Sequence, residues 1–172
     1  ILEQNGMSWT FLKEGSGQDS SNNEGKTYVP DDNFEKALIA LGYDDVLDDY
    51  VLTSNISTVT TLEIRGDYNQ PINEKIASLT GIEGFSALTV LKCNTNQLTN
   101  LDVSQNTALT SLFWGSNLLN SLDVSKNTAL TLLSFPDNQL TSLDVSQNTA
   151  LLALGCGSNQ LTSLDVSQNT AL

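Results

Sequence analysis

The feature that most limits how this chain can fold is a repeat of 21 residues in its second half. Residues 88–108 read LTVLKCNTNQLTNLDVSQNTA, three further copies follow at 109–129, 130–150 and 151–171, and Leu172 begins a fifth. Eleven of the 21 positions are identical in all four copies, so the copies are expected to share one backbone conformation. A unit of this length cannot bury its apolar side chains alone, which predicts a stack of similar turns.

The apolar positions of each copy describe how the chain turns. Their spacings of 3, 7, 3 and 2 fit neither a long helix nor a continuous strand, and in the second copy they are Leu109, Leu112, Leu119, Leu122 and Val124. A chain that coils once per copy and points these side chains into a shared interior accounts for them. Pro136 cannot donate a ladder hydrogen bond, so the strand of each copy is expected to be about three residues long.

Two asparagines recur in every copy and predict ladders at two corners. One column comprises Asn96, Asn117, Asn138 and Asn159, and the other comprises Asn106, Asn127, Asn148 and Asn169. At a corner, backbone amides and carbonyls turn inward and need partners. A stacked Asn amide both donates and accepts along the column. Ligand binding by these amides is the alternative interpretation.

The repeat resembles a known family. The pattern Leu88-x-x-Leu91-x-Cys93-x-x-Asn96-x-Leu98 is similar to the leucine-rich repeat core, with Cys93, Trp114, Phe135 and Cys156 at a position that usually holds Leu. The segment Leu-Asp-Val-Ser-x-Asn-Thr-Ala resembles a short bacterial variant. Upstream, a triplet spacing of apolar residues resembles an internalin-type repeat, as in Ile76, Leu79, Ile82, Phe85 and Leu88. The resemblance covers about residues 59–172 and implies an α/β-type repeat solenoid with a curved parallel β-sheet and few helices outside a short N-terminal cap.

The first half is expected to hold different parts. We interpret 1–13 as the end of a preceding domain or strand, 14–27 as a polar linker, 28–58 as a helical cap, 59–87 as an irregular repeat and 88–172 as the regular solenoid. In the cap, Asp32 or Asn33 is the expected N-cap of a helix that ends near Gly42, with Phe34, Leu38 and Leu41 on one face. Residues 66–75 are interpreted as an insertion after a first, degenerate strand around Leu62.

Composition excludes several classes of function. Seven Lys and Arg against 20 Asp and Glu give a net charge of −13, which argues against nucleic acid and against an anionic membrane surface. The chain has no His, so His-dependent nucleophiles and His-ligated metals are excluded. No apolar run approaches the ~20 residues that a membrane-spanning helix needs. Residues 1–87 carry 15 acidic and 5 basic side chains, so most of the charge lies outside the repeats.

The cysteines are predicted to be two free, buried thiols. Cys93 and Cys156 hold the same repeat position three copies apart, or roughly 14 Å at about 4.8 Å per turn. A disulfide needs Cα atoms within about 7 Å. The shared position also alternates between small and large side chains, so either the turns widen around Trp114 and Phe135 or Trp114 points partly outward.

Acidic residues are the remaining candidates for chemistry. The column formed by Asp102, Asp123, Asp144 and Asp165 is expected to be structural, with repulsion relieved by backbone N–H donors; bound divalent ions are the alternative. The cluster of Asp44, Asp45, Asp48 and Asp49 lacks the spacing of a calcium loop and is interpreted as a solvated face. Nothing marks two carboxyl groups as a catalytic pair across a cleft. The sequence therefore predicts no enzyme, no metal and no cofactor.

The variable positions of the repeat predict the binding surface. Identity fails mainly on and just after the short strand, where alternate residues point outward. The outward residues are Val90, Lys92, Asn94, Ser111, Phe113, Gly115, Leu132, Ser134, Pro136, Ala153, Gly155 and Gly157. They are mostly apolar or small, which suits a protein partner. Neutral drift of exposed positions is the alternative explanation.

Together these observations favour a non-catalytic, protein-binding or adhesive module of a bacterial protein. The resemblance implies a place on the cell surface, facing outward from the outer membrane, or secretion. The partner would be a protein of a host, of a neighbouring cell or of an outer-membrane complex. The alternative is a structural accessory subunit, similar to a lipoprotein, docked on an outer-membrane protein complex. Catalysis in a domain before Ile1 is a third possibility that the residues do not support.

Overall fold

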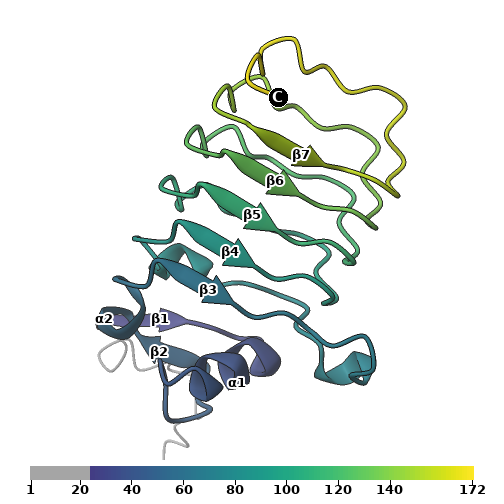
Figure 1. Cartoon of the computed structure of the whole chain (residues 1–172). Coiled ribbons are helices and arrows are strands. Elements are labelled where there is room, and N and C mark those ends of the chain that lie inside the picture. The colour runs from purple at the N-terminus through teal and green to yellow at the C-terminus, as the bar shows by residue number, and fades with distance from the viewer. Residues whose placement is uncertain (1–23) are drawn as a thin grey trace, which may run out of the picture.

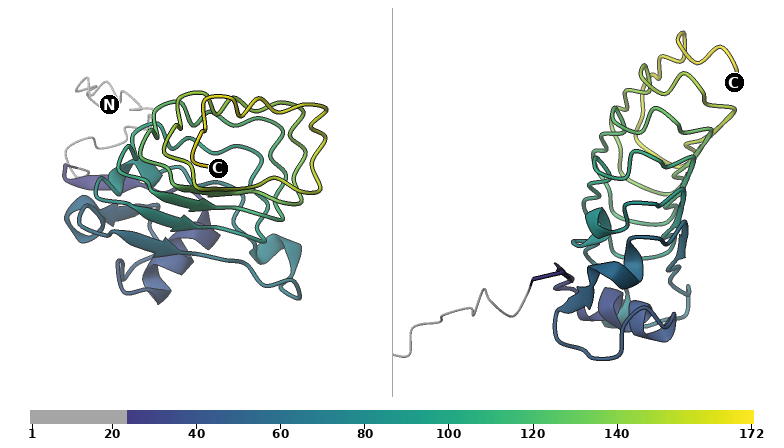
Figure 2. Two further views of the ribbon diagram at one scale, coloured as in Figure 1. Left: turned by 45° about the horizontal axis from the view of Figure 1, so that its top comes forward. Right: turned by 90° about the vertical axis from the view of Figure 1, so that its left-hand side faces the viewer.

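The computed structural model describes residues 24–172, so the expectations for 1–13 and for most of the linker at 14–27 lie outside the described residues. The chain forms a stack of turns, with the strands side by side, on a small N-terminal cap (Figure 1). Viewed nearly along the stack, each turn is a flattened ring, with the strands on one side and irregular backbone on the others (Figure 2). This is the solenoid with a parallel sheet that the repeat predicts.

One five-stranded parallel sheet runs along the solenoid in the order β3-β4-β5-β6-β7. Its strands are three residues each: Thr61–Glu63, Val90–Lys92, Ser111–Phe113, Leu132–Ser134 and Ala153–Gly155. The central leucines pair in register from Leu91 through Leu112 and Leu133 to Leu154. Successive strands in the repeats are therefore 21 residues apart, and the predicted strand length is confirmed.

The turn between β3 and β4 is longer than the others. Leu62 pairs with Leu91, a separation of 29 residues in place of 21. The additional residues form the loop after Gly66, which contains the 3-10 helix η1 at Ile72–Glu74; a second 3-10 helix, η2, spans Ile82–Gly84. Gly66 lies so close to the neighbouring turn that a Cβ atom would meet the carbonyl oxygen of Thr95, so the backbone leaves the sheet at a residue without a side chain.

The cap combines a two-stranded antiparallel sheet with helices. Strands β1 (Lys26–Tyr28) and β2 (Tyr50–Leu52) pair antiparallel, helix α1 spans Asp32–Ala40 between them, and the short helix α2 spans Thr53–Ile56. The cap is thus less helical than expected, and β1 begins inside the segment interpreted as a linker. The acidic segment after Gly42 consists of bends up to β2.

The N-cap of α1 is Asp31, one residue before the predicted candidates. Its Oδ1 accepts from the backbone N–H groups of Asn33 and Phe34, both at 3.0 Å. Its Oδ2 accepts from the N–H groups of Ala77 and Ser78, both at 2.8 Å. Asp31 is favoured as the N-cap because one carboxylate there accepts hydrogen bonds from N–H groups of both the helix start and the first turn of the solenoid.

The core is continuous from the cap to the last turn, and Trp114 belongs to it. Trp114 and Phe135 are both fully buried, and their rings stack with centroids 5.3 Å apart. The outward orientation considered for Trp114 is therefore wrong. Leu41, expected on the buried face of α1, is 44% exposed, because it is the C-cap residue and lies beyond the face that Phe34 and Leu38 bury.

Both asparagine columns are hydrogen-bonded ladders. In the first, Asn117 Nδ2 donates to the carbonyl of Cys93 in the preceding turn at 3.0 Å and to Trp114 in its own turn at 2.9 Å, and its Oδ1 accepts from Leu98 N at 3.0 Å. In the second, Asn127 Nδ2 donates to the carbonyls of Val103 and Asn106 at 2.9 and 3.0 Å. The predicted structural role is confirmed, since each amide satisfies backbone groups that its corner would otherwise bury unpaired.

Candidate functional site

The outer face of the five-stranded sheet is the candidate site. The alternation of the strands is as predicted, with the central leucines buried in β4, β5 and β6 and partly buried in β7, and with the flanking residues at least partly accessible. One row across the face follows the register Glu63, Lys92, Phe113, Ser134 and Gly155, and a parallel row follows Thr61, Val90, Ser111, Leu132 and Ala153. Strand pairing therefore brings most of the predicted outward residues onto one surface.

The third row of predicted residues lies just beyond the strands, and one member does not reach the surface. Asn94, Pro136 and Gly157 are accessible, whereas Gly115 is buried. A Cβ atom on Gly115 would lie 2.9 Å from Pro136 Cγ and 3.3 Å from Asn94 Nδ2, so these neighbours cover it. In the orientation that satisfies both its polar atoms, the Asn94 amide donates to the Phe113 carbonyl at 3.2 Å and accepts from Gly115 N at 3.1 Å. Gly115 thus supports the face without contributing to its surface.

The character of the face changes along the solenoid. Charged side chains stand at the β3–β4 end, the larger apolar side chains Val90, Phe113 and Leu132 lie in the middle, and Ala153, Gly155 and Gly157 leave the β7 end nearly bare. Nothing lies within 4 Å of the place where a Cβ of Gly157 would be. An apolar ridge beside a shelf of small residues is a surface against which another protein can pack closely.

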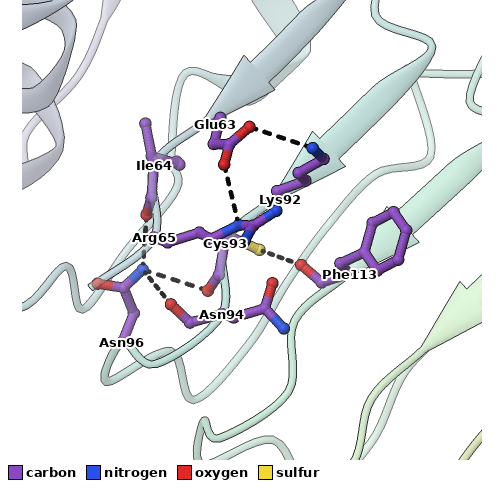
Figure 3. A network of polar contacts seen from close by, with 8 residues as sticks. All are labelled: Glu63, Ile64, Arg65, Lys92, Cys93, Asn94, Asn96 and Phe113. Atoms are coloured by element: carbon purple, nitrogen blue, oxygen red, sulfur yellow. Dashed lines mark hydrogen bonds and ion pairs between the residues drawn. The ribbon is translucent and has the colours of Figure 1, made fainter. Parts of the chain in front are cut away.

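The charged end of the face contains two residues that the sequence reasoning missed, Glu63 and Arg65 (Figure 3). Glu63 forms ion pairs with Lys92 at 3.1 Å and with the Nε atom of Arg65 at 3.2 Å. The alternation of buried Leu62 and Ile64 with exposed neighbours places Glu63 and Arg65 outward. The same alternation, applied to the degenerate strand around Leu62, would have identified both from the sequence.

Beneath this cluster, the first asparagine ladder holds the ends of the strands in place. Asn96 Nδ2 donates to the carbonyls of Ile64, Cys93 and Asn94 at 2.9, 3.2 and 3.4 Å (Figure 3). The Cys93 thiol lies 3.6 Å from the Phe113 carbonyl. Because these contacts fix the backbone on both sides of the outward residues, the face is presented on a rigid support.

The long loop between β3 and β4 stands at the rim of the face. Tyr68 is 78% exposed and Ile72 is 69% exposed, and the Tyr68 hydroxyl lies 3.2 Å from Ser116 Oγ. Hydrogen bonding to Ser116 lowers the pKa of the Tyr68 phenol. The loop therefore reaches across two turns to the corner that borders the outward row, which the interpretation of 66–75 as a mere insertion did not anticipate.

The aspartate column lies on a different side and carries its own compensation. In each copy, the backbone N–H of the serine two residues later donates to the aspartate Oδ1, for example Ser125 N to Asp123 at 2.8 Å. This N–H group, followed by the serine hydroxyl, lowers the pKa of Asp123, Asp144 and Asp165. At Asp102 the hydroxyl of Ser104 is the larger cause of the lowered pKa. The expected relief of repulsion by backbone donors is thus present.

An open groove of about 740 Å³ runs beside part of this column and bears on the enzyme question. Glu83, Asp102 and Asp123 are among the residues that line it. A glycosidase needs one carboxyl group whose pKa is raised, to act as an acid, beside one that stays ionised. Here the pKa values of Asp102 and Asp123 both move downward. Neither of these two groups therefore has the raised pKa of a general acid.

The cysteines and the acidic cap segment do not contribute to the face. Cys93 is fully buried, and this burial raises the pKa of its thiol to about 12. Cys156 is also free but only partly buried, which corrects the expectation of two buried thiols, because fewer side chains cover it in the last turn. Burial also raises the pKa of Asp44, and Asp48 pairs with Lys26 at 3.3 Å.

Within residues 24–172, no three His, Cys, Asp or Glu side chains are grouped in a way that could hold a metal ion. None of the helices in the same range is both long and apolar enough to cross a membrane.

Comparison with known proteins finds similarity to internalins. No family model matches it. Internalin J of Listeria monocytogenes is 42% identical over 98 residues, which are 57% of this chain and 9% of that protein. The solved functional domain of InlJ from the same species, described as including a cysteine ladder, has a TM-score of 0.74 at 41% identity and matches 86% of this chain and 32% of its own. In the present chain Trp114 and Phe135 separate the two cysteines of the stack.

Two other solved structures share the architecture. The internalin InlF of Listeria monocytogenes has a TM-score of 0.70 at 27% identity, over 87% of this chain and 43% of its own. A leucine-rich repeat protein of Leptospira interrogans has a TM-score of 0.57 at 24% identity, over 69% and 31% of the two chains, and supports the fold alone. The present chain thus spans less than half of each of these relatives. The repeat, the parallel sheet and these similarities together show a leucine-rich repeat solenoid that is similar to the internalins.

Proposed function

We propose that the chain is a non-catalytic protein-binding or adhesive module that acts through the outer face of its sheet. The observation that carries the proposal is the composition of this face. Eleven of the 21 repeat positions are identical in all four copies, but the residues on this face vary. The backbone therefore does not dictate which side chains stand there. The result is an apolar ridge with Phe113 at its centre on a surface that is otherwise polar or small.

Rigidity supports the same proposal. The side chains of the face stand on strands whose ends are held by asparagine ladders, so binding would cost little ordering entropy. The similarity to internalin J and InlF is consistent with a module exposed on the bacterial surface or secreted, which meets proteins of a host or of neighbouring cells. The expected partner is therefore a protein rather than a nucleic acid or a small substrate.

A cell-binding assay tests the proposal. Fluorescently labelled chain is incubated with cultured epithelial cells and, separately, with bacterial cells, before and after the cell surface is treated with protease, and bound label is measured by flow cytometry. Phe113→Glu is expected to reduce binding at least tenfold, because it places a charge in the apolar centre of the face. Lys126→Glu, which lies on the aspartate side, is the matched control and is expected to bind normally.

The assay can also contradict the proposal. Binding that is insensitive to protease would point away from a protein partner. Equal binding by Phe113→Glu and the unsubstituted chain, with both folded by circular dichroism, would exclude this face as the binding surface.

A further inference from the structure

The charged side chains at the β3–β4 end of the outer face do not balance one another. Glu63 is the common partner of Lys92 at 3.1 Å and of Arg65 at 3.2 Å. One carboxylate thus serves two cations, which leaves a surplus of one positive charge on the face. The surplus is local, since the chain as a whole has a net charge of −13. A local positive charge on an acidic molecule favours contact with a negatively charged group of a partner.

Arg65 has binding capacity that the fold does not use. Its Nε atom lies 3.2 Å from Glu63, and its two terminal amino groups make no hydrogen bond within residues 24–172. The backbone on both sides is fixed, because Ile64 N donates to Lys92 O and Gly66 N donates to Asn94 O, both at 2.9 Å. Its side chain is 48% exposed. A guanidinium group held in this way offers a planar pair of donors that matches the two oxygens of a carboxylate.

An apolar site lies directly beside these cations. Lys92 is in register with Phe113 on the next strand, and neighbouring strands are about 4.8 Å apart. Because the Lys92 ammonium turns toward Glu63, the Phe113 ring is not covered by it (Figure 3). Val90 and Leu132 flank Ser111 in the adjacent row. A ligand that spans this part of the face meets donors at one end and apolar surface at the other.

We propose that this face recognises a protein segment that presents an aspartate or glutamate side chain next to an apolar side chain. The carboxylate binds the terminal amino groups of Arg65 and competes with Glu63 for Lys92, while the apolar side chain packs on Phe113. The inference rests on the proposed function and names the chemistry of its partner. A single carboxylate beside an apolar group fits better than a polyanion, because a net charge of −13 would repel a dense array of negative charges.

Matched peptides provide the test. Synthetic 12-residue peptides with a central Phe-Glu or Leu-Glu pair are compared with partners in which Glu is replaced by Gln, and affinity for the whole chain is measured by fluorescence polarisation at 150 mM salt. The Glu peptides are expected to bind about tenfold more tightly than their Gln partners. Arg65→Gln is expected to abolish this preference, and Arg65→Lys to restore only part of it, because Lys lacks the planar fork.

A second substitution separates recognition from a structural role. Glu63→Gln removes the internal competitor, so it is expected to increase the affinity for the Glu peptides about threefold, whereas a face that merely needed its ion pairs would bind less. Lys126→Gln removes one positive charge elsewhere and is expected to leave the preference intact. Thermal unfolding of each variant confirms that the fold is kept.

The outcomes distinguish this inference from the function on which it rests. Equal affinity for Glu and Gln peptides, a preference that survives Arg65→Gln, or no detectable binding of any peptide would overturn the recognition of a carboxylate. The proposed function is decided by the cell assay with Phe113→Glu, which does not depend on Arg65. Reduced peptide affinity in Glu63→Gln would show that the ion pairs only maintain the fold.

Discussion

The repeats and the N-terminal part of this chain satisfy their buried polar groups in different ways. In residues 88–172 the backbone groups at the corners are satisfied by copies of the same contacts, as in the Asn117 and Asn138 ladder, where Leu98 N and Leu119 N each donate to the amide oxygen of the next turn. In residues 24–87 the contacts occur once. Asp31 and Asn33 join the start of helix α1 to the first turn, and buried Glu35 accepts from Asp48 N and Tyr50 N.

The difference shows where specificity resides in such a fold. A repeated contact stabilises every turn by a similar amount and leaves the outer face free to vary, because the interior already determines the backbone. A contact that occurs once determines how the stack begins. Losing a repeated contact should therefore have a local effect, whereas losing a contact that occurs once should loosen the junction between the cap and the solenoid.

The largest effect is expected for Trp114→Ala. The substitution leaves a cavity beside Phe135 in the middle of the repeats, and the free energy of unfolding is expected to fall by about 4 kcal/mol. Trp114→Phe is the matched control and should cost much less, since Phe already occupies the equivalent position of the next turn. Urea unfolding followed by circular dichroism measures both. Similar losses for Ala and Phe would show that packing at this position is not what holds adjacent turns together.

Asp31→Ala is expected to lower the free energy of unfolding by less than Trp114→Ala, but to affect the whole cap. It removes four hydrogen bonds, two to the start of α1 and two to the turn at Ala77 and Ser78, with an expected loss of about 3 kcal/mol. Asp123→Ala removes one such bond at an exposed corner and should have a much smaller effect. Amide hydrogen exchange should show faster exchange across the cap for Asp31→Ala alone. Equal exchange in the two variants would remove the distinction between single and repeated contacts.

Acid should weaken the repeats through the aspartate column. The pKa of each column aspartate is lowered in the folded chain, so its contribution to stability is complete above the unfolded value of about 3.8 and is lost as the pH falls through the folded value. The melting temperature should therefore drop below about pH 4. Asp123→Asn and Asp144→Asn together keep an acceptor oxygen and should flatten this drop. A drop of unchanged size would assign acid sensitivity to the cap carboxylates.

The smallest expected effect is a gain in stability. Ser158 has a φ of 53°, a left-handed conformation that also occurs at Thr95, Ser116 and Asp137 in the same corner of the other turns. Ser158→Gly relieves the conformational cost, offset in part by the entropy of the unfolded chain, for a net gain of about 0.5 kcal/mol. Ser163→Gly, in the same turn but not left-handed, should destabilise slightly. Melting curves of the two variants should move in opposite directions.

The regular half was largely predictable because each repeat position can be compared in four copies. The strand positions, the buried leucines and the roles of both asparagine columns all follow from identity between copies. The cap offered no such redundancy. Its N-cap was misplaced by one residue, and neither the pairing of β1 with β2 nor the contact between Tyr68 and Ser116 has a local signature. Long-range pairing of this kind depends on contacts that a single sequence does not reveal.

The sequence predicted which strand residues of the candidate site point outward, but not the contacts that these residues make. Alternation along the strands placed Lys92 and Phe113 outward, while Gly115 is covered by Pro136 and Asn94, which lie far from it in sequence. The pairing of Glu63 with both Arg65 and Lys92 depends on the register between β3 and β4 across the longer turn.

The sequence by itself determined the repeat, the turn length and the inward and outward sides of the sheet, because a period of 21 residues admits one way of burying its leucines. The tertiary structure alone decided that Trp114 stacks on Phe135 inside the core, that Asp31 joins the cap to the solenoid, and that two cations share one carboxylate on the outer face. These outcomes depend on which turns lie next to each other and at what distance. Packing and electrostatic contacts between distant residues are set only when the whole stack forms.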